Sequence, residues 1–343
     1  MKCIKKQYYR APIIILLFLS LFSCKKNAAP PSSIPAAAYS ISGSKIYHLS
    51  SPIQLVGANA FQVFSAGSSD MNGWNLDIAR EAIGNPKETP LSGGVIKDAN
   101  GAYLYSLQTV VDSNRKNNRI TIICPFAWDG TSATYFTGTR PTMTSWWPNF
   151  KIVLAQWSTY FKDQADVWIE VWNEPYIYNG TDGYTDAVWT TDMNALVSII
   201  RNAGNNNIVL VPCAKQGQDE SVLIANGNSF LSGKSNILFD VHAYELWLLS
   251  TNSNIGSRLS QLQQKNLPVI FGETAPMNAG TLMNPQSFLD SVYSRGMSVC
   301  AWVWKYSNTD QDALLNTTGG PNNINNNNWG STYKGLAARQ RNP

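Results

Sequence analysis

Short apolar runs alternate with longer polar stretches along most of the chain. Runs such as Ile120–Cys124 and Ile208–Val211 are apolar on consecutive residues, which is typical of parallel strands covered on both faces. The stretches Asp192–Ala203 and Gly256–Lys265 instead have the spacing of amphipathic helices. We therefore expect eight strands, at Ile53–Ala60, Asn75–Ile83, Arg119–Phe126, Val167–Pro175, Ile208–Cys213, Leu238–Tyr244, Pro268–Thr274 and Ser298–Lys305.

Eight repeats of strand and helix over about 290 residues predict an α/β fold, a (β/α)8 TIM barrel forming a single domain over residues 40–343. The stretch from Ala60 to Asn75 leaves little room for a full first helix. Ser40–Leu49 alternates apolar and polar residues around a glycine, which predicts a small N-terminal β-hairpin at the bottom of the barrel. Asn316–Trp329 is rich in Asn and Gly and predicts a long loop, which either shapes a cleft or is solvated filler.

The first residues have the pattern of an export signal. A basic start precedes the short apolar run Ala11–Phe22, and Leu21-Phe22-Ser23-Cys24 resembles a bacterial lipoprotein cleavage site. Residues 1–24 are therefore predicted to be a lipoprotein-type signal peptide, and residues 25–39 a Pro/Ala/Ser-rich tether. Lipidation of Cys24 would anchor the exported protein to a bacterial membrane, at its periplasmic face or the cell surface. Because Phe22 is bulky for its position, ordinary cleavage and an uncleaved anchor stay open.

Composition and charge narrow the class of protein. Hydrophobic residues make up 44% of the chain and charged residues 14%, which is typical of a globular protein with a sizeable core. The net charge is +4, but basic residues of the first 26 positions supply +6, which leaves −2 for residues 27–343. A domain without basic excess is not expected to bind nucleic acid. We expect a monomer, and the many Trp and Tyr residues favour carbohydrate without proving it.

Cysteines and histidines give no sign of a disulfide or a metal site. Cys124, Cys213 and Cys300 fall in or at the end of expected strands that are not neighbours, so buried free thiols are predicted. The chain holds two histidines and no Cys-x-x-Cys pair, which argues against zinc. Walker, Gly-x-Gly-x-x-Gly and Gly-x-Ser-x-Gly motifs are also absent from the sequence, and we expect no cofactor.

Two glutamates carry the strongest chemical signal. Glu174 lies in Val-Trp-Asn-Glu-Pro at 171–175, and Glu273 lies in Ile-Phe-Gly-Glu-Thr at 270–274. Each stands at the carboxyl end of an expected strand, where barrel active sites lie. A strand-end glutamate taken alone is also compatible with a helix cap or a surface charge. Together they predict two carboxyls across one pocket, the arrangement that breaks glycosidic bonds.

At these motifs the chain, from about Ser40 to its end, resembles glycoside hydrolase family 5, the cellulase and mannanase family of retaining (β/α)8 glycosidases. The resemblance implies that Glu174 is the general acid/base and Glu273 the nucleophile. It also implies that Asn173 bonds the sugar 2-hydroxyl. Phe239-Asp-Val-His242-Ala-Tyr244 resembles the sixth-strand motif of the family. Because His242 and Tyr244 are two positions apart on a strand, their side chains point to the same side. Tyr244 would bond the nucleophile, and His242 would order the acid/base or contact substrate.

Further site residues follow from the same resemblance. Arg80 is the candidate for the second-strand arginine that orients the nucleophile, with a surface salt bridge as the alternative. Trp304 is expected to floor the cleavage subsite, with Trp302 as its rival. Many members carry a histidine after the third strand, where this chain has Pro125-Phe-Ala-Trp128-Asp129. Trp128 or Asp129 would take its place, and Trp128 would otherwise be a sugar platform or packing.

Other aromatic residues are expected in the loops after the third, fourth and sixth strands, where each is either a sugar platform or packing. They are Trp146, Trp147, Tyr178, Tyr184 and Trp247.

The sequence thus predicts a lipid-anchored retaining endo-β-glycanase that acts on a polysaccharide such as β-1,4-glucan or β-mannan. Two alternatives remain at this stage. One is a catalytically weak or inactive glycan-binding surface lipoprotein, because fold alone does not secure catalysis. The other is an exo-acting β-glycosidase, which would need a loop that blocks one end of the cleft.

Overall fold

The computed structural model describes residues 38–64, 69–305, 311–324 and 328–343. The predicted signal peptide, Cys24 and nearly all of the predicted tether lie outside these ranges. Tyr39, expected at the end of the tether, instead begins the first strand. Among the described residues, no helix has the length and apolar character needed to cross a membrane.

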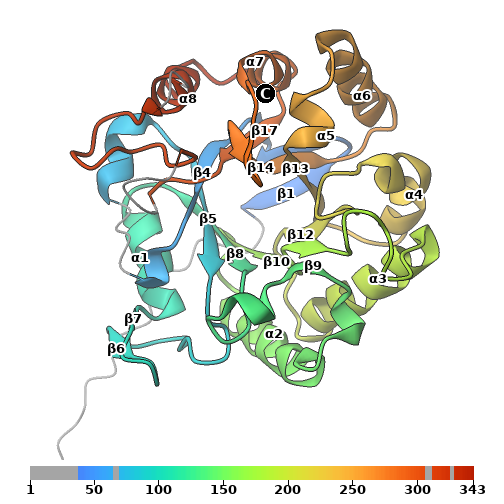
Figure 1. Cartoon of the computed structure of the whole chain (residues 1–343). Helices are drawn as coiled ribbons and strands as arrows, with labels where there is room; N and C mark the ends of the chain where they lie inside the picture. The colour runs from blue at the N-terminus through green and yellow to red at the C-terminus, as the bar shows by residue number, and fades with distance from the viewer. Residues whose placement is uncertain (1–37, 65–68, 306–310, 325–327) are drawn as a thin grey trace, which may run out of the picture. The chain divides into compact units, whose positions relative to one another are not determined.

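Eight parallel strands close into a barrel, in the order in which they follow one another along the chain (Figure 1). This confirms the predicted (β/α)8 architecture. Every strand falls within its predicted run, except that the sixth begins one residue earlier. The barrel strands are β4 (Val56–Ala60), β5 (Ile78–Ile83), β8 (Ile120–Pro125), β10 (Val167–Glu170), β12 (Val209–Pro212), β13 (Ile237–Ala243), β14 (Val269–Thr274) and β17 (Ser298–Ala301).

Helices follow the strands around the outside of the barrel (Figure 1). After β4 the chain makes two short 3-10 helices, η1 (Gln62–Phe64) and η2 (Ser69–Trp74), as the short spacing there predicted. Two more 3-10 helices are η3 (Ser132–Thr134) and η4 (Pro141–Met143). The α-helices are α1 (Leu107–Lys116), α2 (Trp147–Phe161), α3 (Asp186–Asn202), α4 (Ser221–Leu231), α5 (Glu245–Leu248), α6 (Asn252–Gln264), α7 (Gln286–Ser294) and α8 (Trp329–Ala337).

Three pairs of two- or three-residue strands lie outside the barrel. They are β6 (Ile96–Lys97) with β7 (Tyr103–Leu104), β9 (Thr137–Thr139) with β11 (Glu174–Pro175), and β15 (Met277–Asn278) with β16 (Thr281–Leu282). The predicted fourth strand, Val167–Pro175, is therefore two strands. β10 ends at Glu170, and β11 pairs with β9.

Alternation along the strands divides the core into two layers. Side chains facing the helices form the larger apolar cluster, and those facing the barrel axis form a smaller one that includes Ile78, Ile122 and Trp168. The N-terminal strands β1 (Tyr39–Ser42), β2 (Lys45–His48) and β3 (Ser51–Ile53) form an antiparallel sheet whose Ile46 belongs to the inner cluster. The predicted hairpin therefore closes the barrel at its amino-terminal end, with a third strand added.

The expectations for the cysteines and for the Asn-rich segment can also be compared with the structure. Cys124, Cys213 and Cys300 are buried free thiols, as predicted. In the described part of the Asn-rich segment, Asn322 is buried, donates through Nδ2 to Ala313 O, and accepts from Gly330 N–H of α8. Asn322 therefore packs against the last helix, whereas Thr317, Thr318 and Gly319 of the same segment are exposed to solvent.

Close approach of β4 and β5 at the inner layer leaves no space for a side chain at position 57. A Cβ on Gly57 would lie 2.3 Å from Ile78 Cγ2 and 2.4 Å from Ile78 O. We predict that Gly57→Ala lowers the free energy of unfolding by about 3 kcal/mol or more, because the clash includes backbone. The measurement is urea denaturation, with Gly73→Ala as the matched control, since a Cβ there meets nothing within 4 Å. Equal midpoints for the two variants would contradict the packing described.

Candidate active site

Above the inner apolar layer, the inward positions of the strands become polar. Two residues after Ile78 and Trp168 stand Arg80 and Glu170, and Leu238 is followed in the same way by Asp240. Since side chains at spacing two share a face of a strand, these groups point into the barrel. Arg80, Glu170 and Asp240 have no exposed surface. A layer of buried charges thus lies directly above the apolar plug.

Arg80 uses all five of its N–H groups. Its Nε and Nη2 donate to the two carboxylate oxygens of Glu170, at 2.7 and 2.8 Å. Nη1 donates to Asn59 Oδ1 at 2.7 Å and to Glu273 Oε1 at 2.6 Å. The second Nη2 hydrogen goes to Asn173 Oδ1 at 2.8 Å. The guanidinium therefore joins four strands or strand ends, and it is not the surface ion pair considered as an alternative.

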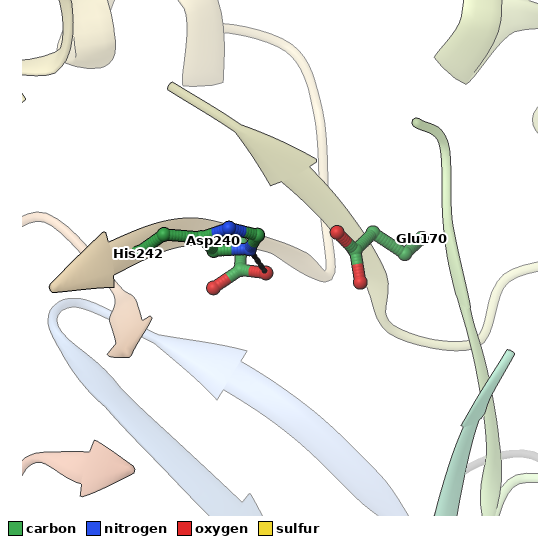
Figure 2. Close-up of side chains that lie close together, drawn as sticks. All are labelled: Glu170, Asp240 and His242. Carbon is green, nitrogen blue, oxygen red and sulfur yellow. Dashed lines mark ion pairs between the residues drawn. The ribbon is translucent and has the colours of Figure 1, made fainter. Parts of the chain in front are cut away.

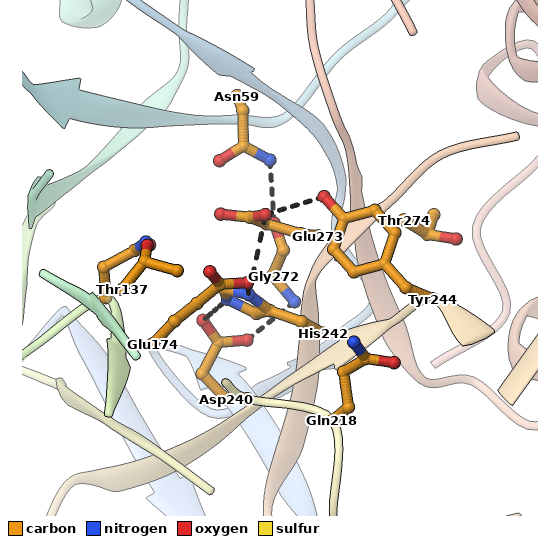
Figure 3. Close-up of polar contacts among 12 residues, drawn as sticks. Asn59, Thr137, Glu174, Gln218, Asp240, His242, Tyr244, Gly272, Glu273 and Thr274 are labelled. Carbon is orange, nitrogen blue, oxygen red and sulfur yellow. Dashed lines mark hydrogen bonds and ion pairs between the residues drawn. The ribbon is translucent and has the colours of Figure 1, made fainter. Parts of the chain in front are cut away.

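Glu273 stands on β14 next to His242 of β13. The register between these strands shifts between Val241 and His242, so that His242 lies opposite Glu273. The Tyr244 hydroxyl donates to Glu273 Oε2 at 2.7 Å, while Arg80 holds Oε1 (Figure 3). Burial raises the pKa of Glu273, and the charges of His242 and Arg80 lower it. Burial also raises the pKa of Tyr244, so its hydroxyl remains a donor.

Glu174 lies on β11, beside the barrel mouth. Its backbone N–H donates to Phe136 O, and Thr137 of β9 is its register partner. His242 Nδ1 lies 2.8 Å from Glu174 Oε1. The Glu174 side chain keeps 14% of its surface exposed, compared with 5% for Glu273. Glu174 is therefore the more solvent-accessible of the two carboxyls.

The two glutamates meet across the imidazole of His242. One oxygen of Glu174, one oxygen of Glu273 and a His242 ring nitrogen all lie within 4.8 Å of one another. Figure 3 shows both carboxylates directed to the same side of the ring. Residues 99 positions apart in the sequence thus form one pair of carboxyls, one fixed by Arg80 and Tyr244 and the other at the edge of the site. Such a pair can supply a nucleophile and a proton donor.

Asp240 lies below His242, as Figure 2 shows together with Glu170. Asp240 Oδ1 accepts from Gly272 N–H at 2.7 Å, and Oδ2 lies 3.3 Å from His242 Nε2. Burial alone would lower the pKa of His242, but the charges of Glu273 and Asp240 raise it well above its ordinary value. Burial raises the pKa of Glu170 to about 8, against the lowering effect of Arg80.

Two groups of side chains have the composition of a metal site: Glu170 with Asp240 and His242, and Glu174 with His242 and Glu273. In the first group, both Glu170 oxygens accept hydrogen bonds from Arg80. In the second group, Glu273 is occupied by Arg80 and Tyr244. Arg80 and His242 supply the positive charge that these carboxylates require, so the residues present fit a metal poorly.

The two tryptophans after β17 differ in exposure. Trp304 is completely buried and packs edge-on against Trp74 at 5.1 Å between ring centroids. This burial contradicts the expectation that Trp304 floors a subsite, because a ring without exposed surface offers no face to a sugar. Trp302 is partly exposed. Its backbone N–H donates to the backbone oxygen of Thr274, the residue after Glu273. The Trp302–Val303 peptide bond is cis.

The segment after β8 corrects a second expectation. Trp128 is 8% exposed and packs on Phe150, which indicates core packing and not a platform. Asp129 accepts hydrogen bonds from Thr131 and Thr134 of its own turn. Phe126 is the residue that reaches the mouth, where it stacks on Trp302 at 5.6 Å with an interplanar angle of 21°.

The remaining loop aromatics are mostly packing residues. Trp247 is completely buried, and its indole N–H donates to Gln218 O. Trp146, Trp147 and Tyr184 are partly buried against the core. Tyr178 is 38% exposed. Of these five, Tyr178 has the largest surface open to a ligand.

Sequence reasoning missed several members of the site. Asn59, Glu170 and Asp240 are polar residues of otherwise apolar strands, Glu170 at the end of β10, and they occupy inward positions. Charged residues are almost never fully buried unless they are paired. A buried polar position in each of several strands was therefore a readable signal for a charged network. Phe126 gave no comparable signal, because its role depends on contact with Trp302.

Comparison with known proteins identifies a family and relatives for this chain. The family model of cellulases, glycosyl hydrolase family 5, matches residues 59–308. The chain is 27% identical over 149 residues, 43% of its length, to a mannan endo-1,4-β-mannosidase of Cellvibrio japonicus. It is 25% identical over 195 residues, 53% of its length, to a β-mannanase/endoglucanase A of Caldicellulosiruptor saccharolyticus. The matches cover 33% and 14% of these relatives, so the chain spans less than two thirds of either.

Solved structures show the same fold at low sequence identity. A β-mannanase from Thermomonospora fusca superimposes with a TM-score of 0.69 and 16% identity, covering 89% of this chain and 98% of that one. The catalytic domain of a Thermobifida fusca endoglucanase gives a TM-score of 0.62, again at 16% identity, with the same coverage of 89% and 98%. With the family model matching most of the chain and the barrel matching these structures, the chain belongs to glycosyl hydrolase family 5, the cellulase family.

Proposed function

We propose that the protein is a retaining endo-β-glycanase that hydrolyses a β-1,4-linked mannan or glucan. The observation that carries this proposal is the approach of Glu174 and Glu273, whose nearest oxygens lie within 4.8 Å. Retaining glycosidases hold their carboxyls about 5–5.5 Å apart, whereas inverting enzymes need about 6.5–9.5 Å to admit a water molecule. The short separation favours attack by a carboxylate over direct attack by water.

In the first step, Glu273 attacks the anomeric carbon while Glu174 gives its proton to the leaving glycosidic oxygen. The bond to that oxygen breaks, and a covalent glycosyl ester forms on Glu273. Arg80 and Tyr244 each bond one oxygen of Glu273, which supports its ionised form before attack. In the second step, water attacks the ester as Glu174 takes its proton, and Glu273 leaves as a carboxylate.

Substrate contacts are proposed from the buried amide of Asn173 and from the partly exposed rings of Trp302 and Phe126 beside this pair. Asn173 donates one amide hydrogen to Thr137 Oγ1 at 3.0 Å, which leaves its second amide hydrogen for the sugar 2-hydroxyl. Trp302 and Phe126 form the aromatic wall against which an apolar sugar face would pack. The two curated relatives bear the names of a mannan-cleaving enzyme and a combined mannanase and endoglucanase. These names support β-mannan and β-glucan as substrates and an endo mode.

We predict that Glu273→Ala abolishes turnover by several orders of magnitude, because the ester can no longer form. With an activated aryl β-glycoside, azide should then restore release of the aryl group and give an α-glycosyl azide. The matched Glu174→Ala variant should give the β-azide, because its nucleophile is intact. Chromatography and NMR of the products provide the measurement. Wild-type-like activity of Glu273→Ala would refute the assignment.

The two tryptophans provide a second test. We predict that Trp302→Ala raises KM about tenfold or more, because about 1.4 kcal/mol of ring stacking is lost. Trp304→Ala should instead lower the free energy of unfolding by about 3–5 kcal/mol, since it empties a buried site. Michaelis kinetics and urea denaturation of both variants separate the effects. A rise in KM confined to Trp304→Ala would reverse the assignment.

Export and lipid anchoring through Cys24 are proposed from the N-terminal sequence alone. A lipid chain on Cys24 and a tether after it would hold the barrel near a bacterial membrane, in reach of polymer fragments. We predict that the mature protein from a bacterial host begins at Cys24 with a diacylglyceryl thioether. Mass spectrometry of the N-terminal peptide tests this, with Cys24→Ala as the control. An unmodified cysteine or a cleavage elsewhere would overturn the proposal.

A further inference from the structure

Asp240 of β13 contacts Gly272 of β14 and lies near His242 of its own strand, but it makes no contact with Glu174 or Glu273. Its side chain has no exposed surface. Oδ1 accepts from the N–H of Gly272, the residue before Glu273, at 2.7 Å. A Cβ on Gly272 would lie 2.2 Å from Asp240 Oδ2, so a larger residue would displace the carboxylate. Asp240 therefore occupies the space that a side chain at position 272 would fill.

The remaining oxygen of Asp240 needs a hydrogen-bond donor. Within the described residues Oδ2 makes no hydrogen bond of good geometry, and the nearest possible donors are His242 Nε2 at 3.3 Å and Arg80 Nε at 3.7 Å. The Nε hydrogen of Arg80 goes to Glu170 at 2.7 Å. His242 Nε2–H is thus the donor left for this buried carboxylate oxygen, which would otherwise be unsatisfied.

A competing contact does not change this assignment. Arg80 Nη2 lies 3.4 Å from His242 Nε2, and would donate to it if Nε2 were unprotonated. Nη2 has only two hydrogens, however, and both make shorter bonds of 2.8 Å to Glu170 and Asn173. A further bond from Nη2 to Nε2 would have to share one of these two hydrogens, so a hydrogen on Nε2 directed at Asp240 satisfies more of the buried groups.

We propose that Asp240 is a positioning residue that holds the imidazole of His242 through Nε2–H, so that Nδ1 points at Glu174. Its catalytic meaning rests on the proposed function. Gly217 packs closely against the imidazole ring of His242. A Cβ at position 217 would lie only 2.8 Å from His242 Cγ, so this side of the ring has no room to move. Nδ1 lies 2.8 Å from Glu174 Oε1 and 3.5 Å from Glu273 Oε2. Both neighbours of Nδ1 are carboxyl oxygens that can accept a hydrogen bond, so Nδ1 also carries a hydrogen and the ring is an imidazolium.

Charges around the ring agree with this state. Burial raises the pKa of Asp240, but His242 and Arg80 hold it below its ordinary value, so Asp240 is ionised. Burial raises the pKa of the thiols of Cys124, in β8, and of Cys213, directly after β12, and keeps them neutral. The other titratable or charged groups around the imidazole come from β5, β10, β11, β14 and the end of β13. They are Arg80, Glu170, Glu174, Glu273 and Tyr244.

The sequence contains two histidines, His48 and His242, so histidine labelled with ¹⁵N gives a spectrum that can be read directly. His48→Gln assigns the signals. In the wild-type protein, His242 should show both nitrogens protonated at pH 7 and above, where a free imidazole is mostly neutral. In Asp240→Asn, the amide oxygen can still accept from Gly272 but the charge is gone. The His242 midpoint should then fall by about one pH unit or more.

Kinetics provide a second readout that a merely structural role would not move. The imidazolium charge lowers the pKa of Glu273. Its loss in Asp240→Asn should raise that pKa, and the acid limb of the kcat/KM profile should move to higher pH. Asp129→Asn is the matched control, because within the described residues the Asp129 carboxylate accepts its hydrogen bonds from Thr131 and Thr134 of its own turn. Asp129→Asn should leave both the His242 signals and the profile unchanged.

Two results would overturn the proposal. One is a wild-type His242 that is neutral at pH 7, which needs no variant and holds even if Asp240→Asn fails to fold. The other is a folded Asp240→Asn protein whose His242 midpoint and acid limb match those of the wild type. Failure of the proposed function would give a different result. The wild-type protein would then be inactive on glycans, but its His242 would still be protonated at both nitrogens at pH 7.

Discussion

A fully buried guanidinium is the constraint on which the site depends. Arg80 has no exposed surface, and a cation in that position is costly unless each N–H finds an acceptor. Its five hydrogen bonds run to Glu170, Asn59, Glu273 and Asn173. Removing one partner of a buried pair costs about 3–5 kcal/mol, because the other charge is left uncompensated. The guanidinium therefore fixes the positions of four side chains from different strands or strand ends at once.

The same network gives the two glutamates different surroundings. Glu273 is bonded through both oxygens, by Arg80 and by Tyr244, so its ionised form is stabilised and its orientation is fixed. Glu174 has His242 as its side-chain partner and keeps more exposed surface. Two carboxyls in unlike environments can carry out unlike tasks, and this asymmetry is what acid and nucleophile require. Roles in such a pair follow from neighbours more than from the carboxyls themselves.

Predictions from the sequence were accurate where strand periodicity applies. Consecutive apolar residues located the eight barrel strands, and spacing two placed His242 and Tyr244 beside the carboxyls that they contact. The same rule would have found Glu170 and Asp240, which share an inward face with Trp168 and His242. Glu170 ends β10 and Asp240 lies inside β13, and neither belongs to the motifs that carry Glu174, His242 and Glu273. A charged residue within an otherwise apolar strand indicates a buried ionic network, and the sequence shows this pattern at both positions.

Predictions failed where the chain leaves regular strand geometry. β17 ends at Ala301, so alternation no longer decides whether Trp302 or Trp304 faces the cleft. In the same way, β8 ends at Pro125, and the turn that follows buries Trp128 and exposes Phe126. Orientation there depends on long-range contacts such as the stacking of Phe126 on Trp302, which a local pattern does not contain. Barrel loops carry specificity, so the residues whose orientation the sequence did not predict lie where a substrate would be selected.

Glycine at position 272 connects the backbone to the chemistry. The shift in register between β13 and β14 brings Glu273 opposite His242, and strand irregularities of this kind re-aim side chains near active sites. Without a Cβ, Gly272 also leaves room for the Asp240 carboxylate and donates its N–H to it. One small residue thus serves both the orientation of Glu273 and the burial of the charge below His242. A side chain at this position, on the strand that carries Glu273, would displace the Asp240 carboxylate, which lies 2.2 Å from where the Cβ would stand.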